Sequence, residues 1–223
     1  MKPYYDHSGI TIYNGDCVDV LPQLKPVDLL LTDPPYGIHY RSNYRKNKFD
    51  YIKGDRAFPQ NWLGDKLLNS NGSLYIFANE ACLDVAKLAI KEAKFNTIRM
   101  LVWDKGATAG GNLDDYGTKC EYILYSKRKY AKLRGSRDSN IISIPRVHPT
   151  ILIHPAEKPK ALVTYLIMKS TDYDDIVCDP FMGSGTTLVA AKELGRKAIG
   201  IEISEEYCEL TVRRSAQEVL PFG

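Results

Sequence analysis

A short apolar run that ends in two prolines constrains the fold of this chain more than any other stretch. Residues 27–32 read Val-Asp-Leu-Leu-Leu-Thr, which is typical of a strand buried on both faces of a parallel sheet. Asp33-Pro34-Pro35-Tyr36 comes next, and the strand must stop there because each proline fixes its own φ and lacks an N–H. The sequence therefore predicts a stiff loop at the carboxyl end of a buried strand, where open α/β sheets bind ligands.

The residue types in this loop suit the recognition of a planar amine. Asp33 is a hydrogen-bond acceptor, the carbonyl of Pro34 is a second one, and Tyr36 offers an aromatic face. Two acceptors beside a stacking platform would hold the NH₂ group of a nucleobase. The alternative is a proline-terminated strand with an incidental aspartate, the usual interpretation of a Pro-Pro turn alone. We predict that the catalytic residues are Asp33, Pro34, Pro35 and Tyr36.

A glycine-rich loop forms the second motif. Residues 179–187 read Asp-Pro-Phe-Met-Gly-Ser-Gly-Thr-Thr, between a predicted strand and a predicted helix. Glycines let backbone N–H groups approach a ligand closely at a helix N-terminus, and Glu202 at the end of the next strand can accept the hydroxyls of a ribose. A P-loop would need a lysine, and a dinucleotide fingerprint would need a third glycine. The remaining interpretations are an adenosyl ligand without a polyphosphate, or a glycine turn without a ligand.

Strand and helix patterns alternate along most of the chain. Predicted strands lie at 10–13, 27–32, 73–78, 98–103, 121–125, 175–179 and 197–202. Predicted helices lie at 18–24, 62–68, 80–94, 159–170 and 186–194, with a last one starting at Ser204. This alternation predicts a doubly wound, mostly parallel α/β sheet, and 223 residues suit one domain over 1–223. Polar stretches at 37–58 and 104–150 are predicted insertions, with a flexible loop at 105–112.

The net charge of +3 is distributed unevenly. Residues 126–146 contain seven basic residues against one acidic residue, and residues 39–56 contain six against two. Tyrosines interleave with these charges, which suits phosphate contact combined with base stacking. The alternative is a pair of solvated, lysine-rich loops. The predicted nucleic-acid contacts are Tyr40, Arg41, Arg45, Lys46, Lys48, Lys127, Arg128, Lys129, Lys132, Arg134 and Arg137.

Composition argues against several other classes of protein. No stretch approaches the roughly 18 apolar residues of a membrane span, and the N-terminus has no apolar signal region. Five cysteines without a Cys-x-x-Cys pair indicate a reducing compartment. His148 and His154 have no cysteine cluster beside them, so we predict no metal site. We expect a soluble cytoplasmic protein.

Together, the two motifs resemble the S-adenosylmethionine-dependent DNA amino-methyltransferases, which methylate N6 of adenine or N4 of cytosine. The catalytic loop precedes the glycine loop here, and residues 154–159 (His-Pro-Ala-Glu-Lys-Pro) come just before the cofactor strand. This circularly permuted order resembles the β group of the family, over about residues 9–217. The resemblance implies a Rossmann-like methyltransferase fold, S-adenosylmethionine as cofactor, double-stranded DNA as partner and a bacterial or phage-infected host cell. It allows a homodimer, and it does not indicate whether a restriction enzyme accompanies the chain.

The resemblance also assigns the cofactor site residue by residue. The glycine loop would bind the methionine end, Glu202 the ribose, and the segment at Asp16 the adenine. His154 and Lys158 would close over the methionine end, although a helix cap is an alternative role for His154. The implied cofactor-binding residues are Asp16, Cys17, Asp33, His154, Lys158, Asp179, Pro180, Phe181, Gly183, Ser184, Gly185, Thr186, Thr187 and Glu202.

The target base is the main choice that the resemblance leaves open. Asp33 favours adenine, because the cytosine enzymes more often resemble a Ser-Pro-Pro-Tyr pattern. An N4-cytosine enzyme, an RNA base methyltransferase and a non-catalytic binding subunit remain alternatives. Methylation at carbon 5 of cytosine would use a Pro-Cys turn, and no Pro-Cys pair occurs in the chain. The recognition segments at 37–58 and 104–150 are short, so the sequence does not predict the target site.

Overall fold

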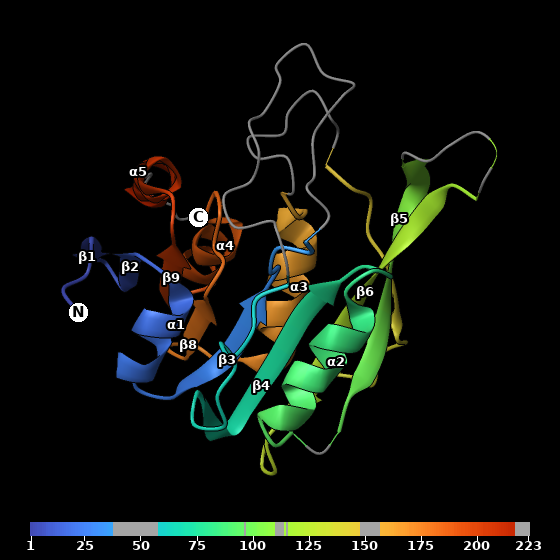
Figure 1. Cartoon of the computed structure of the whole chain (residues 1–223), viewed down its shortest axis with the longest axis horizontal. Helices are drawn as coiled ribbons and strands as arrows, with labels where there is room; N and C mark the ends of the chain where they lie inside the picture. Colours follow the sequence, from blue (N-terminus) through green and yellow to red (C-terminus); the bar gives the residue numbers. More distant parts are fainter. Residues whose placement is uncertain (38–57, 96, 110–113, 115, 148–156, 217–223) are drawn as a thin grey trace.

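One twisted sheet organises the chain (Figure 1). The structure, a computed structural model, describes residues 1–37, 58–95, 97–109, 114, 116–147 and 157–216, without the side chains of 107–109. The strands are β1 (Tyr5–His7), β2 (Ile10–Asn14), β3 (Val27–Thr32), β4 (Leu68–Ala78), β5 (Arg99–Ala109), β6 (Thr118–Lys127), β7 (Ile141–Ser143), β8 (Ile176–Asp179) and β9 (Lys197–Glu202). The helices are α1 (Cys17–Val20), the 3₁₀ turn η1 (Leu21–Gln23), α2 (Leu83–Glu92), α3 (Lys160–Ser170), α4 (Thr186–Glu193) and α5 (Glu205–Ala216).

The sheet has the order β1-β2-β9-β8-β3-β4-β6-β5-β7. The five strands β2, β9, β8, β3 and β4 are parallel to one another, and β7 is parallel to β5. The pairs β1–β2, β4–β6 and β5–β6 are antiparallel. The predicted doubly wound, mostly parallel α/β sheet is therefore confirmed.

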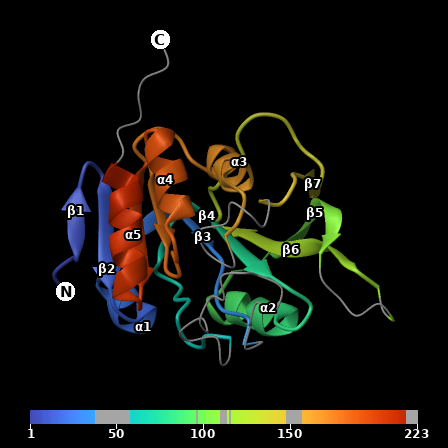
Figure 2. The ribbon, with the colours of Figure 1, turned by 90° about the horizontal axis from the view of Figure 1, so that it is seen from above.

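Helices cover both faces of this sheet, with α3, α4 and α5 on one face and α1 and α2 on the other (Figure 2). The leucine run of β3 alternates between the two cores: Leu29 and Leu31 pack toward α3 and α4, and Leu30 packs toward α1 and α2. All three leucines are at most 1% exposed. Such a strand needs apolar residues at successive positions, and truncating one of them to alanine would cost about 2–5 kcal/mol.

The chain reverses its winding direction between β3 and β8. From β3 it continues to β4 on one side, and from β8 it continues to β9 on the other side. The loops that follow these two adjacent strands therefore diverge and leave a crevice between them at the carboxyl edge, the usual ligand position in such sheets. Both sequence motifs lie in these two loops.

Two predictions about local structure are wrong, and two short strands were missed. The apolar pattern at 62–68 forms no helix: Trp62 and Leu63 are buried in a loop, and Leu68 begins β4. Packing of Trp62 edge-on against Phe181, with ring centroids 5.3 Å apart, uses this apolar surface without helical geometry. Strand β5 continues through the predicted flexible loop to Ala109, with a register shift after Asp104 and a φ of +78° at Gly106. The edge strands β1 and β7 were not predicted, since three residues carry too little periodicity.

Candidate active site and cofactor loop

The catalytic loop begins where β3 ends, and the carboxylate of Asp33 is held by two side chains. Asp33 Oδ1 accepts a hydrogen bond of 2.5 Å from the Tyr36 hydroxyl. Asp33 Oδ2 accepts one of 2.6 Å from Lys158 Nζ, which lies just before α3. Pro34 is buried and Pro35 and Tyr36 are half-buried, so the two prolines fix the path of the loop against the body of the domain. The structure therefore brings the four predicted catalytic residues together around one carboxylate.

Lys158 belongs to a chain of four charged side chains from four separate segments. Its Nζ lies 3.2 Å from Glu121 Oε2 on β6 as well as 2.6 Å from Asp33 Oδ2. Glu121 Oε1 lies 3.3 Å from Lys105 Nζ on β5. The Lys158 ammonium also lies over two aromatic rings, 5.6 Å from the centroid of Tyr36 and 5.1 Å from that of Phe77. Two ammonium groups and two carboxylates alternate, so this largely buried cluster is electrically neutral.

Burial and charge act in opposite directions on these groups. Burial raises the pKa of Asp33; Lys158 only partly offsets that rise, and Glu121 adds to it. Burial alone would lower the pKa of Lys158, but the carboxylates of Asp33 and Glu121 outweigh burial and raise it. The same two carboxylates and burial raise the pKa of Tyr36 well above its ordinary value. At neutral pH the cluster thus contains a firmly protonated lysine, a protonated phenol and an aspartate more basic than a surface one.

The aspartate of the glycine loop has a different environment. Asp179 is 4% exposed, and its Oδ1 accepts hydrogen bonds from Thr32 Oγ1 at 2.8 Å and from Phe181 N at 3.1 Å. Its Oδ2 accepts one of 2.7 Å from Thr187 Oγ1. Burial raises the pKa of Asp179 to about 6, against the effect of these hydrogen bonds. Three donors of the protein thus hold the two oxygens of Asp179 in place at the base of the glycine loop. The cofactor-binding role of Asp179 stays a prediction.

The last helix braces the glycine loop from outside. Gly183 and Gly185 have φ values of +51° and +79°, and a Cβ on Gly185 would lie 2.3 Å from Thr211 Cγ2 of α5. Thr211 Oγ1 donates to the carbonyl of Gly183, and Arg214 Nη1 donates to the carbonyl of Ser184 at 2.8 Å. Glycine at 185 is therefore required both for its backbone conformation and for the close approach of α5.

Acidic residues at the ends of β2 and β9 complete the predicted cofactor site. Glu202 Oε2 accepts a hydrogen bond of 3.1 Å from Gly183 N, which joins the ribose-binding candidate to the glycine loop. Asp16 is exposed and caps α1 by accepting a hydrogen bond from Val18 N. Cys17 is buried, and burial raises the pKa of its thiol to about 12. The thiol therefore stays uncharged and suits an apolar contact. The carboxylates of Asp16 and Glu202 can accept hydrogen bonds, and the glycine loop offers backbone N–H donors. This combination fits an adenosyl group with free hydroxyls.

The segment before α3 connects the two loops. Glu157 Oε1 accepts hydrogen bonds from Thr186 Oγ1 at 3.3 Å and from Arg214 Nη2 at 3.1 Å, on the cofactor side. The next residue, Lys158, binds Asp33 on the catalytic side. Lys158 thus contacts the carboxylate that is predicted to be catalytic, which its predicted role at the methionine end did not anticipate. His154 lies outside the described residues.

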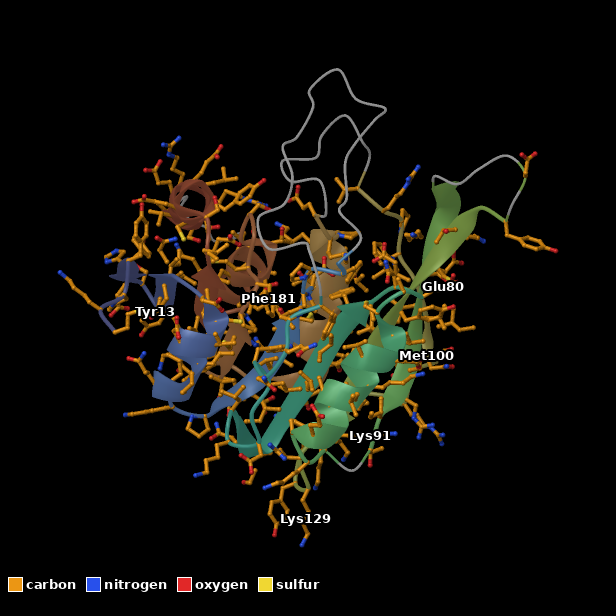
Figure 3. The ribbon with its side chains drawn as sticks, in the orientation of Figure 1. Tyr13, Glu80, Lys91, Met100, Lys129 and Phe181 are labelled. Carbon is orange, nitrogen blue, oxygen red and sulfur yellow. The ribbon has the colours of Figure 1, made fainter. Side chains whose placement is uncertain are left out.

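The two predicted nucleic-acid segments have different outcomes. Tyr40, Arg41, Arg45, Lys46 and Lys48 lie outside the described residues. The second segment starts at Lys127, which pairs with Ser73 at the amino end of the parallel part of β4. In Figure 3, Lys129 lies at the lower edge of the molecule, far from Phe181 of the cofactor loop.

Contacts within the domain already engage much of this second segment. Lys127 Nζ donates to the Ala131 carbonyl at 2.6 Å, and Arg128 stacks over the ring of Phe95 at 4.0 Å. Arg134 pairs with Asp172 at 2.7 Å, and its N–H donates to the last turn of α3. These contacts hold the start of the segment against the amino end of β4 and the last turn of α3. The nucleic-acid contacts predicted for Lys127, Arg128, Lys129, Lys132, Arg134 and Arg137 stay a prediction.

Four polar residues near the site were missed from the sequence: Lys105, Glu121, Glu157 and Arg214. Glu121 is the first residue of a predicted strand and Lys105 follows another, and local sequence patterns do not show which charges such residues meet. In the part of the chain that the structure describes, no group of three His, Cys, Asp or Glu side chains could hold a metal ion. The helices among the same residues are too short and polar for any of them to cross a membrane.

The chain is similar to known DNA-modifying enzymes. A family model described as DNA methylase, for N6 and N4 methyltransferases, matches residues 27–213. The type II methyltransferase M2.MboI of Moraxella bovis is 29% identical over 96% of this chain and 91% of its own length. M2.DpnII of Streptococcus pneumoniae is 27% identical over 97% of this chain and 93% of its own.

Solved structures agree with this similarity. The M1.HpyAVI complex with S-adenosylmethionine superposes with a TM-score of 0.69 at 29% identity, over 92% of this chain and 99% of that one. The PvuII methyltransferase, specific for N4 of cytosine, has a TM-score of 0.74 at 20% identity, over 98% of this chain and 90% of that one, and so supports the fold alone. With both motifs at one edge of the sheet and a family match over most of its length, this chain belongs to the S-adenosylmethionine-dependent N6/N4 DNA methylase family.

Proposed function

We propose that this chain methylates the N6 amine of adenine in double-stranded DNA. The observation that carries the proposal is the position of Asp33, a carboxylate at the carboxyl end of β3 directly beside the cofactor loop. The hydrogen bond of 2.8 Å from Thr32 to Asp179 joins the ends of β3 and β8, so the two loops flank one crevice. An aspartate rather than a serine before the two prolines supports adenine over cytosine.

The chain's own residues would activate the amine. The lone pair of an exocyclic amine is delocalised into the base, so the free amine is a poor nucleophile. Hydrogen bonds from its two N–H groups to the Asp33 carboxylate and the Pro34 carbonyl favour a tetrahedral nitrogen, whose lone pair is no longer delocalised. When bound, S-adenosylmethionine supplies the methyl group from a sulfonium that leaves as a neutral thioether. The amine then releases one proton, to Asp33 or to water.

The loop must rearrange when the base arrives. Tyr36 donates its hydroxyl to Asp33 Oδ1, the oxygen that is not paired with Lys158. The incoming amine would replace this hydroxyl as the donor, and the Tyr36 ring would stack on the base. A base inside a duplex cannot reach the crevice, so it must first flip out of the helix. Much of the rate would come from holding amine and methyl group in line.

The cofactor-binding roles of the remaining residues are part of the proposal. Gly183, Ser184 and Gly185 would enclose the methionine end, Phe181 would pack beside it, and Glu202 would accept the ribose hydroxyls. Asp16 and Cys17 would meet the adenine ring. Double-stranded DNA is the proposed substrate, with 38–57 and the β5–β6 hairpin as proposed contact segments.

The test is a measurement of modified nucleosides. DNA from a methylation-free bacterial host that expresses the chain is hydrolysed, and N6-methyladenine and N4-methylcytosine are quantified by mass spectrometry. A rise in N6-methyladenine that disappears with Asp33→Ala supports the proposal. A rise in N4-methylcytosine alone would transfer the assignment to cytosine. If neither rises while the purified chain binds S-adenosylmethionine, the proposal is wrong, and RNA and a non-catalytic role become the candidates.

A further inference from the structure

The charged chain at the active site extends beyond the residues that the proposed reaction uses. Asp33 lies in the loop after β3 and Lys158 lies just before α3, whereas Glu121 and Lys105 belong to β6 and β5. The Lys105 side chain is 8% exposed and that of Glu121 is 21% exposed. Burying two further charges costs desolvation energy that their pairing need not repay, so their place in a chain of contacts that ends at Asp33 needs an explanation.

We propose that Glu121 and Lys105 are positioning residues for methyl transfer. Glu121 shares the Lys158 ammonium with Asp33 and thereby weakens the pairing of Lys158 with Asp33, and Lys105 sets how strongly Glu121 does so. The inference rests on the proposed role of Asp33. It assigns the two residues no contact with DNA or cofactor.

The geometry supports a division of Lys158 between two carboxylates. Lys158 Nζ lies 2.6 Å from Asp33 Oδ2 and 3.2 Å from Glu121 Oε2, so both carboxylates lie in its first contact shell. The contact with Glu121 is the longer of the two, so Lys158 pairs more closely with Asp33 than with Glu121. Glu121 Oε1 is bound separately by Lys105. Each carboxylate oxygen of Glu121 therefore faces a different ammonium group.

Asp33 must be held in a fixed position and must also remain a strong hydrogen-bond acceptor, and this arrangement serves both requirements. A lysine that pairs with one oxygen fixes the carboxylate and leaves the other oxygen for the amine of the base. A lysine that pairs with Asp33 alone would also withdraw charge from it and weaken it as an acceptor for the amine. Glu121 restores that charge while keeping the lysine in place. Lys105 limits the influence of Glu121 on Asp33, because Lys105 balances part of the negative charge of Glu121.

The groups that act on Asp33 come from every element around the crevice. Lys158 approaches from the start of α3, Glu121 from β6, and Tyr36 from the loop itself. Asp179 lies across the crevice at the end of β8, and the neutral thiol of Cys82 lies near the start of α2. Lys105 acts through Glu121. Among these groups, Glu121 and Lys105 are the charged pair outside both sequence motifs and the segment before α3.

The experiment measures single-turnover methyl transfer against pH, at saturating cofactor and DNA, for Glu121→Gln and Lys105→Met. Glu121→Gln should lower the rate about 10-fold and move the acid limb of the pH profile down by about one unit, because Asp33 then faces Lys158 without a competing carboxylate. Lys105→Met should move the same limb up, because the charge of Glu121 is then less compensated. The affinity for S-adenosylmethionine by calorimetry should stay within about twofold in both variants.

Opposite displacements of one limb are a result that a purely structural role would not give. The matched control is Lys169→Met, which breaks the partly buried pair of Lys169 with Asp138 (2.8 Å) at the other end of α3. It should lower the melting temperature without moving the pH profile. Unchanged profiles, or displacements in the same direction, would overturn the inference. If Glu121→Gln does not fold, the direction of the Lys105→Met shift decides.

The Asp33→Asn variant distinguishes a failure of this inference from a failure of the proposed catalytic role of Asp33. If Asp33→Asn transfers methyl groups at the unaltered rate, the proposed function of Asp33 is wrong, and the inference falls with it. If Asp33→Asn is inactive while the two variants leave the pH profile in place, the inference alone is wrong.

Discussion

Two aspartates occupy equivalent places in this fold and have different chemistry. Asp33 and Asp179 each end a buried parallel strand, each precede a proline, and lie on adjacent strands. Asp33 is paired with the charged Lys158 and the hydroxyl of Tyr36, whereas three uncharged donors bind Asp179. At Asp33, one oxygen is bound by the Tyr36 hydroxyl of the same loop, and we expect a ligand to displace this partner. The comparison teaches that two aspartates at equivalent positions of a sheet edge can have different partners, and from these partners we expect catalysis at Asp33 and support of the glycine loop by Asp179.

The largest effect should follow from removing the charge of Asp33. Asp33→Asn keeps the shape of the side chain but loses the anionic acceptor, so methyl transfer should fall by about 10³-fold or more. Calorimetry should find the affinity for S-adenosylmethionine within about threefold of the unmodified chain. A parallel loss of cofactor affinity would mean that Asp33, like Asp179, supports the cofactor loop.

Truncation of Asp179 should give the reverse pattern. Asp179→Ala leaves the buried donors of Thr32, Phe181 and Thr187 without their acceptor, at a cost of about 2–4 kcal/mol in the free energy of unfolding. Cofactor affinity should fall because the glycine loop loses its support. Urea unfolding and calorimetry measure the two effects, and an unaltered stability would show that the loop does not depend on this carboxylate.

The pH dependence of stability should distinguish the ionised from the neutral form of Asp179. Its folded pKa of about 6 lies above the ordinary value of 3.8, so the folded state binds the proton more tightly. The contribution of this group to stability is therefore full below about pH 4 and is lost as the pH rises through about 6, by roughly 2–3 kcal/mol.

Asp179→Asn removes that titration while keeping a similar shape. The amide oxygen can accept from Thr32 and Phe181, and the amide NH₂ can donate to the Thr187 hydroxyl. Relative to the unmodified chain, Asp179→Asn should gain stability between pH 4 and pH 7 in urea titrations. A constant difference across this range would show that Asp179 ionises normally in the folded protein.

The smallest effect should come from the hydroxyl of Tyr36. Tyr36→Phe keeps the ring for stacking and removes the donor that occupies Asp33 Oδ1, so turnover should change by less than about tenfold. The Michaelis constant for DNA should not rise, because the incoming amine no longer displaces a hydroxyl. A loss as large as that of Asp33→Asn would contradict the role of Tyr36 as a replaceable partner.

Much of the fold and both loops could be predicted from local sequence. The buried strand at 27–32 followed from three adjacent leucines, and its end followed from Pro34 and Pro35, whose backbone limits hold in any fold. The helix at 62–68 failed because Trp62 and Leu68 gave an apolar pattern that a loop and a strand use equally well. Amphipathic periodicity does not identify the surface that will cover an apolar side chain.

The partners of each charge could not be predicted, because they depend on which segments the sheet brings together. Lys158 lies 125 residues from Asp33 in the sequence, and the strand order β3-β4-β6-β5 brings Glu121 and Lys105 into contact with this pair. The same order places Lys127 and Arg134 at the opposite edge, although their composition suggested a DNA surface. The sequence by itself determined where the chain stops, turns and buries its leucines, since these follow from backbone sterics and apolar patterning. Only the tertiary structure decided which charges meet, because electrostatic interactions depend on distance in space rather than along the chain.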